Sequence, residues 1–128
     1  MKYVLLIYQR PGAFDALAQE ERDALSSEFA AVNEELAASG EFIGGAALAD
    51  PANGRTVRQR DGVPAVTDGP FAEAKEFLAG YWIVDVESPA RAYQIAAEAS
   101  VAPGKGGAPL NMGVEVREVM SAPPTDMP

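Results

Sequence analysis

Two short apolar runs, residues 2–8 and 81–84, constrain the fold of this 128-residue chain more than any other feature. Both are too short for helices of ordinary length, and neither alternates between apolar and polar residues. Such runs are typical of strands that are covered on both faces of their sheet. We therefore predict that these two segments are the central strands of one sheet.

Two helices are predicted, one after each central strand. The first covers roughly residues 16–38 and ends at Gly40. The second begins with Ser88 as its N-cap and Pro89 at its first helical position. Each carries an apolar stripe that can lie on a sheet. The stripe residues are Leu25, Phe29, Val32 and Leu36 in the first helix, and Ala92, Ile95, Ala96 and Ala99 in the second.

Two further strands, at residues 42–48 and 114–117, and a hairpin complete the pattern. Asp61-Gly62 is a strong hairpin signal within residues 55–67, and Pro64 places that hairpin at an edge. The order of elements predicts an α+β, ferredoxin-like βαββαβ fold with an inserted β-hairpin. Two helices cover only one face of such a sheet. The doubly apolar central strands therefore predict a sheet-on-sheet homodimer, which by default has a two-fold axis.

The composition limits the classes of function. A formal charge of −9 argues against nucleic acid and anionic membranes as partners, because both require clustered Lys and Arg. The chain contains no cysteine and no histidine, which excludes thiolate and imidazole chemistry. A metal would need carboxylate and carbonyl oxygens alone, and no acidic spacing resembles an EF-hand. We predict neither a metal nor a cofactor.

Length and hydropathy predict one domain over residues 1–119, followed by a disordered tail over residues 120–128. No stretch approaches the roughly 20 apolar residues that span a bilayer. The absence of cysteine fits a reducing compartment, so we predict a cytoplasmic protein.

The run from Asp68 to Glu76 is the candidate catalytic site. It gathers the carboxylates Asp68, Glu73 and Glu76 with the ammonium of Lys75. If they were packed together and partly buried, the carboxylates would repel one another, and one could hold a proton near pH 7. Lys75 could instead keep them ionised and bind an anionic or carbonyl oxygen. As exposed ion pairs they would contribute only about 0–1 kcal/mol each, with Asp68 serving as a turn residue.

Aromatic residues on the central strands supply candidate substrate-binding groups. Tyr8 and Tyr81 could line a cleft for a small aromatic or apolar ligand, or they could simply be core residues. Two functions therefore stay open. One is an enzyme or binding protein for a small organic molecule. The other is a non-catalytic dimeric module that binds a protein partner through its acidic helix or its basic hairpin (Arg55, Arg58 and Arg60).

The chain resembles the YCII-related family, in its DGPF-motif group, in four segments that occur in family order. They are Lys2 to Tyr8, Val66 to Glu76, Gly80-Tyr81-Trp82 and Val114-Glu115-Val116-Arg117. The resemblance extends from residue 1 to about 119 and implies a dimeric α+β barrel. Ala74 stands where many members have Thr.

The resemblance implies less about chemistry. Related YCII proteins are thought to use a His–Asp pair in a cleft, and one branch resembles dehydrochlorinases that act on small aromatic compounds. This chain has no histidine, so that activity is not carried over. The association of some DGPF genes with alternative sigma factors implies a regulatory or stress-linked role.

Overall fold

The computed structural model, which describes residues 1–69 and 75–121, places the two apolar runs side by side at the centre of one sheet. β1 (Lys2–Gln9) pairs antiparallel with β5 (Phe77–Asp85). β2 (Phe42–Ala47) pairs with the other side of β5, and β6 (Val114–Glu118) pairs with the other side of β1. The resulting order, β2-β5-β1-β6, is antiparallel throughout.

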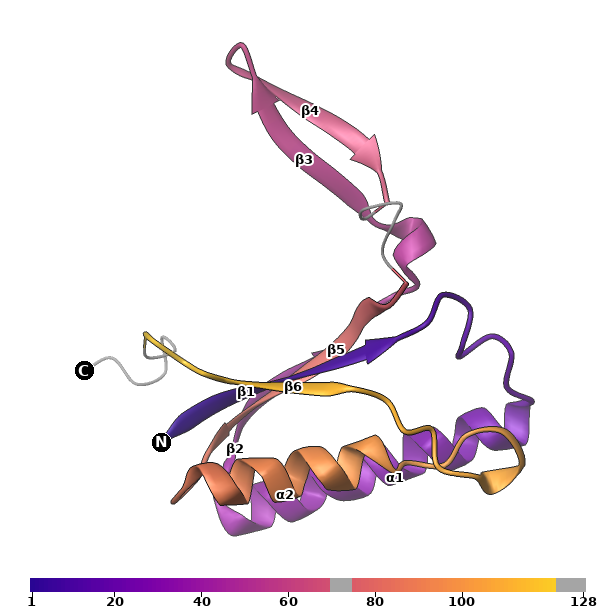
Figure 1. The fold of residues 1–128 in the computed structure, drawn as a ribbon, viewed down its shortest axis with the longest axis vertical. Helices are drawn as coiled ribbons and strands as arrows, with labels where there is room; N and C mark the ends of the chain where they lie inside the picture. Colours follow the sequence, from indigo (N-terminus) through magenta and orange to yellow (C-terminus); the bar gives the residue numbers. More distant parts are fainter. Residues whose placement is uncertain (70–74, 122–128) are drawn as a thin grey trace.

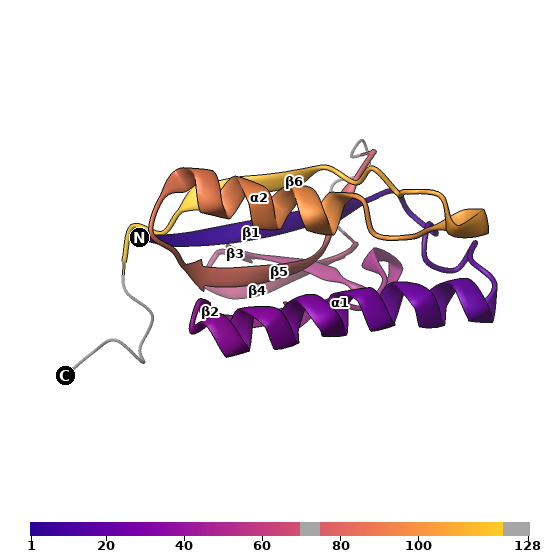
Figure 2. The ribbon, with the colours of Figure 1, turned by 90° about the horizontal axis from the view of Figure 1, so that it is seen from below.

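Two helices cover one face of this sheet (Figures 1 and 2). α1 (Gln19–Ser39) lies along the β2 side and α2 (Pro89–Ser100) along the β1–β6 side. The predicted start of α2 is confirmed, since the Ser88 hydroxyl accepts a hydrogen bond from the Arg91 backbone N–H at 3.3 Å. Neither helix of the described part of the chain is long and apolar enough to cross a lipid bilayer.

The first helix starts three residues later than predicted, at Gln19. The Glu21 carboxylate accepts the backbone N–H of Ala18 at 2.8 Å, and this bond makes Ala18 the residue that precedes the helix. The predicted end is confirmed, because Gly40 adopts a left-handed conformation with φ of 79°. A residue without a side chain takes that conformation at little cost.

The core lies between the helices and the sheet. All the predicted stripe residues are buried there except Phe29, which is partly buried with its ring edge-on to Trp82 at a centroid distance of 5.6 Å. On β1, the side chains of Tyr3, Leu5 and Ile7 are buried against the helices. Alternate residues on the other face of β1 are only partly covered. In a single chain, the central strands are therefore buried only on the face that the helices cover.

The hairpin is confirmed, but it is not part of the main sheet. β3 (Arg55–Arg60) and β4 (Val63–Asp68) form a separate two-stranded sheet, here called the arm, which stands away from the rest of the molecule (Figure 1). Its turn has positive φ at both Asp61 (50°) and Gly62 (79°), as the Asp-Gly signal requires. The architecture is α+β, with an antiparallel sheet and two helices, and is consistent with a ferredoxin-like fold.

Two short 3-10 turns connect the larger elements. Pro51–Asn53 lies at the base of the arm, where the Asp50 carboxylate accepts the Ala52 N–H at 2.8 Å. Lys105–Gly107 lies between α2 and β6 and is tied to α1, since Glu21 also accepts the backbone N–H of Gly106.

Candidate functional site

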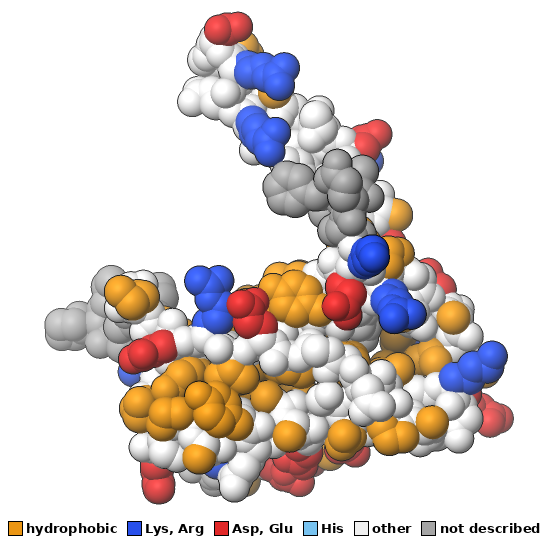
Figure 3. All heavy atoms as spheres, in the orientation of Figure 1, with side chains coloured by type: hydrophobic (Ala, Val, Ile, Leu, Met, Phe, Trp, Pro, Cys, Tyr) orange, Lys and Arg blue, Asp and Glu red, His pale blue; other side chains and the backbone are white. Residues whose placement is uncertain are grey.

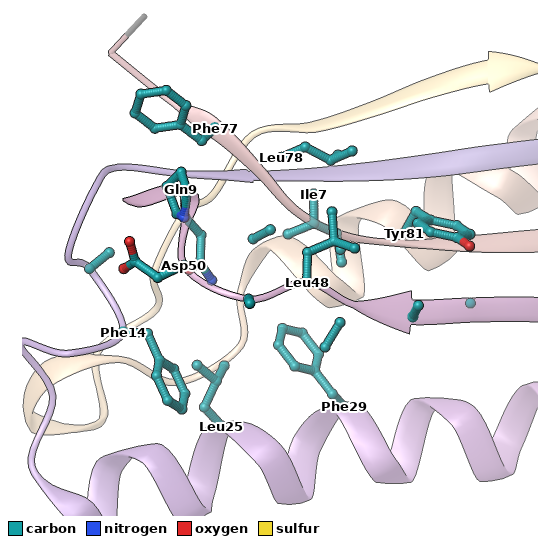
Figure 4. Close-up of a pocket in the computed structure, with 18 of the residues that line it drawn as sticks. Ile7, Gln9, Phe14, Leu25, Phe29, Leu48, Asp50, Phe77, Leu78 and Tyr81 are labelled. Atoms are coloured by element: carbon teal, nitrogen blue, oxygen red, sulfur yellow. The ribbon is translucent and has the colours of Figure 1, made fainter. Parts of the chain in front are cut away.

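A cleft of about 710 Å³ lies between α1 and the β2 edge of the sheet (Figure 4). Its walls come from the middle of α1, the end of β1, β2 and the start of β5. Figure 4 shows Leu25 and Phe29 rising from α1 toward the strands above them. The large apolar side chains that line it are those of Ile7, Phe14, Leu25, Phe29, Phe42, Leu48, Phe77, Leu78 and Trp82. A pocket of this size and lining suits a small organic molecule.

The cleft exists because β2 carries almost no side-chain volume at this point. Residues 44–47 are Gly-Gly-Ala-Ala, so nothing large fills the space between the edge strand and α1. Gly45 is also required for close strand packing. A Cβ atom there would lie 2.6 Å from the Tyr81 carbonyl oxygen and 2.8 Å from Cδ1 of Trp82. The same short side chains therefore permit both the strand pairing and the cleft beneath it.

A few polar groups reach the cleft. Gln9, Asn33 and Asp50 all line it, and Gln9 and Asp50 are toward the same end of the cleft in the view of Figure 4. The side-chain amide oxygen of Asn33 accepts a hydrogen bond from the Trp82 indole N–H at 2.5 Å. Gln9 donates to the Met112 sulfur at 3.4 Å. Apolar walls with few polar groups favour a largely apolar ligand that is oriented at one end.

The loop that closes the end of the cleft is anchored to α1. Arg22 donates hydrogen bonds to the backbone carbonyls of Phe14 at 3.2 Å and Asp15 at 2.9 Å. Its guanidinium also lies over the Phe14 ring, 5.3 Å from the centroid. Phe14 is therefore held in place as part of the cleft wall, although it is 44% exposed.

A smaller hollow of about 400 Å³ adjoins the cleft and shares Gln9, Phe14 and Leu25 with it. Tyr8 and Glu76, both predicted as site residues, line this hollow together. The Tyr8 hydroxyl donates to the Glu115 carboxylate at 3.0 Å, and this hydrogen bond, with some burial, raises the pKa of Tyr8. At neutral pH Tyr8 is therefore a hydrogen-bond donor rather than a base.

The other predicted site residues are distributed more widely. Tyr81 borders the main cleft, although the alternation along β5 directs its side chain to the sheet face opposite the helices. Asp68 is the last residue of the arm, with its side chain 95% exposed and its carboxylate 3.3 Å from Nε of Arg55. Lys75 is exposed, as is Glu76 at the rim of the smaller hollow. Glu73 lies outside the described residues. The partial burial that would couple these carboxylates is not present around Asp68 in a single chain, so their acid–base role stays a prediction.

The turn after Asp68 closes the base of the arm. The Gly69 N–H donates to the Gly54 carbonyl at 2.9 Å, and the Thr56 hydroxyl donates to the Gly69 carbonyl at 2.7 Å. These bonds join the two ends of the arm where it leaves the body.

Sequence reasoning missed several residues that line the cleft, above all Gln9, Asn33 and Asp50. One signal could have found the site. A strand that carries Gly-Gly-Ala-Ala opposite a helix stripe with Leu25 and Phe29 leaves unfilled volume between the two elements. None of the three polar residues stands in a recognisable motif.

An antiparallel sheet with two helices packed on one face defines a class of small α+β domains. Within this class, residues 1–120 match the YCII-related domain, and the chain belongs to the YCII-related family. It is also similar to an uncharacterized protein of Rhizobium meliloti (strain 1021). The two are 30% identical over 128 residues, which cover all of this chain and 99% of that protein. The family predicted from the sequence is confirmed.

Proposed function

We propose that this protein binds a small, mainly apolar organic molecule in the cleft between α1 and the β2–β5 edge of the sheet. The observation that carries the proposal is the cleft itself, about 710 Å³ with walls formed mainly by aromatic and aliphatic side chains. This volume lies within the roughly 300–1,000 Å³ of typical ligand sites. Gln9, Asn33 and Asp50 would orient the polar end of the ligand.

The proposal includes acid–base chemistry on the bound molecule by the carboxylates and ammonium of Asp68, Glu73, Lys75 and Glu76. Its support is that Glu76 lines the hollow next to the cleft, together with Tyr8. Asp68 would need to be covered by another surface before its carboxylate could act in this way. We place the protein in the DGPF-motif group, because the run Asp68-Gly69-Pro70-Phe71 is present.

A homodimer with the topology of a dimeric α+β barrel is also part of the proposal. Its support is the partly covered sheet face opposite the helices, which carries apolar side chains of β1 and β5. A second sheet packed on this face would remove those side chains from water. A cytoplasmic location stays a prediction from composition.

Trp82 offers a direct test of ligand binding, since it is the single tryptophan of the chain and lines the cleft. N-phenyl-1-naphthylamine, a neutral apolar fluorophore, would be titrated while probe emission and Trp82 quenching are recorded. Ala47→Leu adds volume at a lining position, so we expect probe affinity to fall at least tenfold. Ala97→Leu, at an exposed α2 position away from the cleft, is the matched control and should bind like the wild type.

Binding that is unchanged by Ala47→Leu, with Trp82 unquenched, would contradict the proposal.

A second candidate function is then favoured by the exposed arm. A non-catalytic interaction module in a sigma-factor or stress pathway would use that arm to contact a protein partner.

A further inference from the structure

The arm exposes an apolar surface that nothing in its own chain covers. Val57 and Val66 are opposite each other across the two strands and are 59% and 60% exposed. The alternation of strand residues places the neighbouring pair, Gln59 and Pro64, on the same face. None of residues 55–68 is buried. An isolated two-stranded hairpin is only marginally stable in water, so this face calls for a cover.

A second apolar surface lies on the sheet opposite the helices. Val4 pairs with Ile83 and Leu6 pairs with Tyr81, and these four side chains are only partly covered. They form an apolar row across the two central strands, here called the open face.

The arm and the open face lie on the same side of the molecule. In Figure 1 the helices lie below the sheet, while the arm rises above it and leans back over the strands. The space-filling view in Figure 3 shows the arm as a separate projection above the body. A molecule seated on the open face would therefore lie beside the arm.

Charge indicates which molecule is seated on the open face beside the arm. The arm carries Arg55, Arg58 and Arg60 against two aspartates, whereas the whole chain has a formal charge of −9. Arg side chains are visible along the arm in Figure 3. The body of a second copy is thus an acidic partner for a basic arm. A two-fold arrangement also lets both copies cover their open faces and arms at once.

We propose that the arm of each copy closes over a second copy of this chain seated on its open face, with Val57, Pro64 and Val66 packed against the partner. The inference rests on the homodimer of the proposed function and adds the arm as a second, separable part of the interface. Arg55 is on the same face as Val57, whereas Arg58 and Arg60 are on the opposite face with Val63, so the arginines add a long-range attraction between the arm and the acidic partner and no direct contact is assigned to them.

The arm offers a matched set of variants for the test. Val57→Ser combined with Val66→Ser changes the proposed contact face. Val63→Ser changes a valine of equal exposure, 60%, on the opposite face of the arm. Because the Gly69 N–H is bonded to the Gly54 carbonyl, residues 55–68 can also be replaced by an Asn-Gly turn without pulling the ends apart. Leu6→Arg tests the open face independently.

Sedimentation equilibrium would measure the dimer dissociation constant of each full-length variant, with circular dichroism to verify folding. We expect the double Val57/Val66 variant and the arm replacement to weaken the dimer at least tenfold, with Val63→Ser close to wild type. A dimer disrupted by Leu6→Arg but unaffected by both arm changes would overturn this inference while leaving the homodimer intact. Equal weakening by Val63→Ser would also overturn it. A wild-type chain that is monomeric at every concentration would remove both proposals.

Discussion

The body and the arm use the same residue types in opposite environments. In the body, Leu5 and Val84 of the central strands are fully buried, whereas Val57 and Val66 of the arm are about 60% exposed. Both regions have well-paired strands, and the arm has the clearer turn signal. The difference shows that local signals suffice to specify a hairpin. Stability of the body instead comes from burial between layers.

The largest expected effect tests the difference in side-chain burial between the body and the arm. Leu5→Ala removes a fully buried side chain and should lower the free energy of unfolding by about 2–5 kcal/mol. Val57→Ala, in the arm of a monomeric sample, should change it by less than about 0.5 kcal/mol. Urea denaturation followed by Trp82 fluorescence measures both. If Val57→Ala in the monomer costs as much as Leu5→Ala, the arm belongs to the same cooperative core.

A medium effect is expected at two adjacent glycines of β2. Gly45→Ala would place a Cβ against Tyr81 and Trp82 and should cost about 1–3 kcal/mol through overpacking. Gly44→Ala meets nothing within 4 Å and is the matched control, expected within about 0.5 kcal/mol of the wild type. Thermal unfolding by circular dichroism compares the two. Equal costs would show that the close approach of β2 and β5 does not depend on Gly45.

The smallest effect compares the ion pairs of the two regions. Glu41 forms hydrogen bonds with Arg91 at 2.8 and 2.9 Å, and its side chain is 16% exposed, whereas Asp68 in the arm is 95% exposed. Glu41→Gln should cost about 1 kcal/mol at pH 7, since the exposed side of Arg91 weakens the pair. Asp68→Asn should leave the unfolding free energy of the body unchanged.

The pH dependence of Glu41 follows from its environment. The Arg91 hydrogen bonds hold the pKa of Glu41 below its usual 4.5 in the folded state. The unfolded chain therefore takes up the proton more readily, and folding favours the ionised form. Its contribution is complete above about pH 5 and is lost as the pH falls through 4.5 and below. Unfolding curves of wild type and Glu41→Gln should converge at acid pH. A constant difference between them would contradict this assignment.

Much of the fold could be predicted, because its signals are local. Ser88 and Gly40 mark helix ends by their own backbone chemistry, and Asp61-Gly62 marks the hairpin. The helix stripes were predicted correctly from spacing alone. The predicted start of α1 lies three residues before the observed one, because the interactions of the preceding loop depend on Arg22 and Glu21 together.

The candidate site could be predicted only in part. Tyr81 borders the cleft and Tyr8 the adjoining hollow, as their position on central strands suggested. Charge density along the chain, however, does not reveal burial, and the cluster around Asp68 includes a residue on the exposed arm. The cleft is a gap between Phe29, Gly45 and Asp50, which belong to three separate segments. No local pattern contains such a gap.

The sequence by itself determined the elements, their order, the two-sided apolar character of the central strands and the family to which the chain belongs. Each of these depends on residues that are neighbours in the chain or recur at a regular spacing. Only the tertiary structure decided that the hairpin stands apart as an arm, and that small residues of β2 leave a cleft above α1. Those outcomes depend on which distant side chains fill, or fail to fill, the same volume.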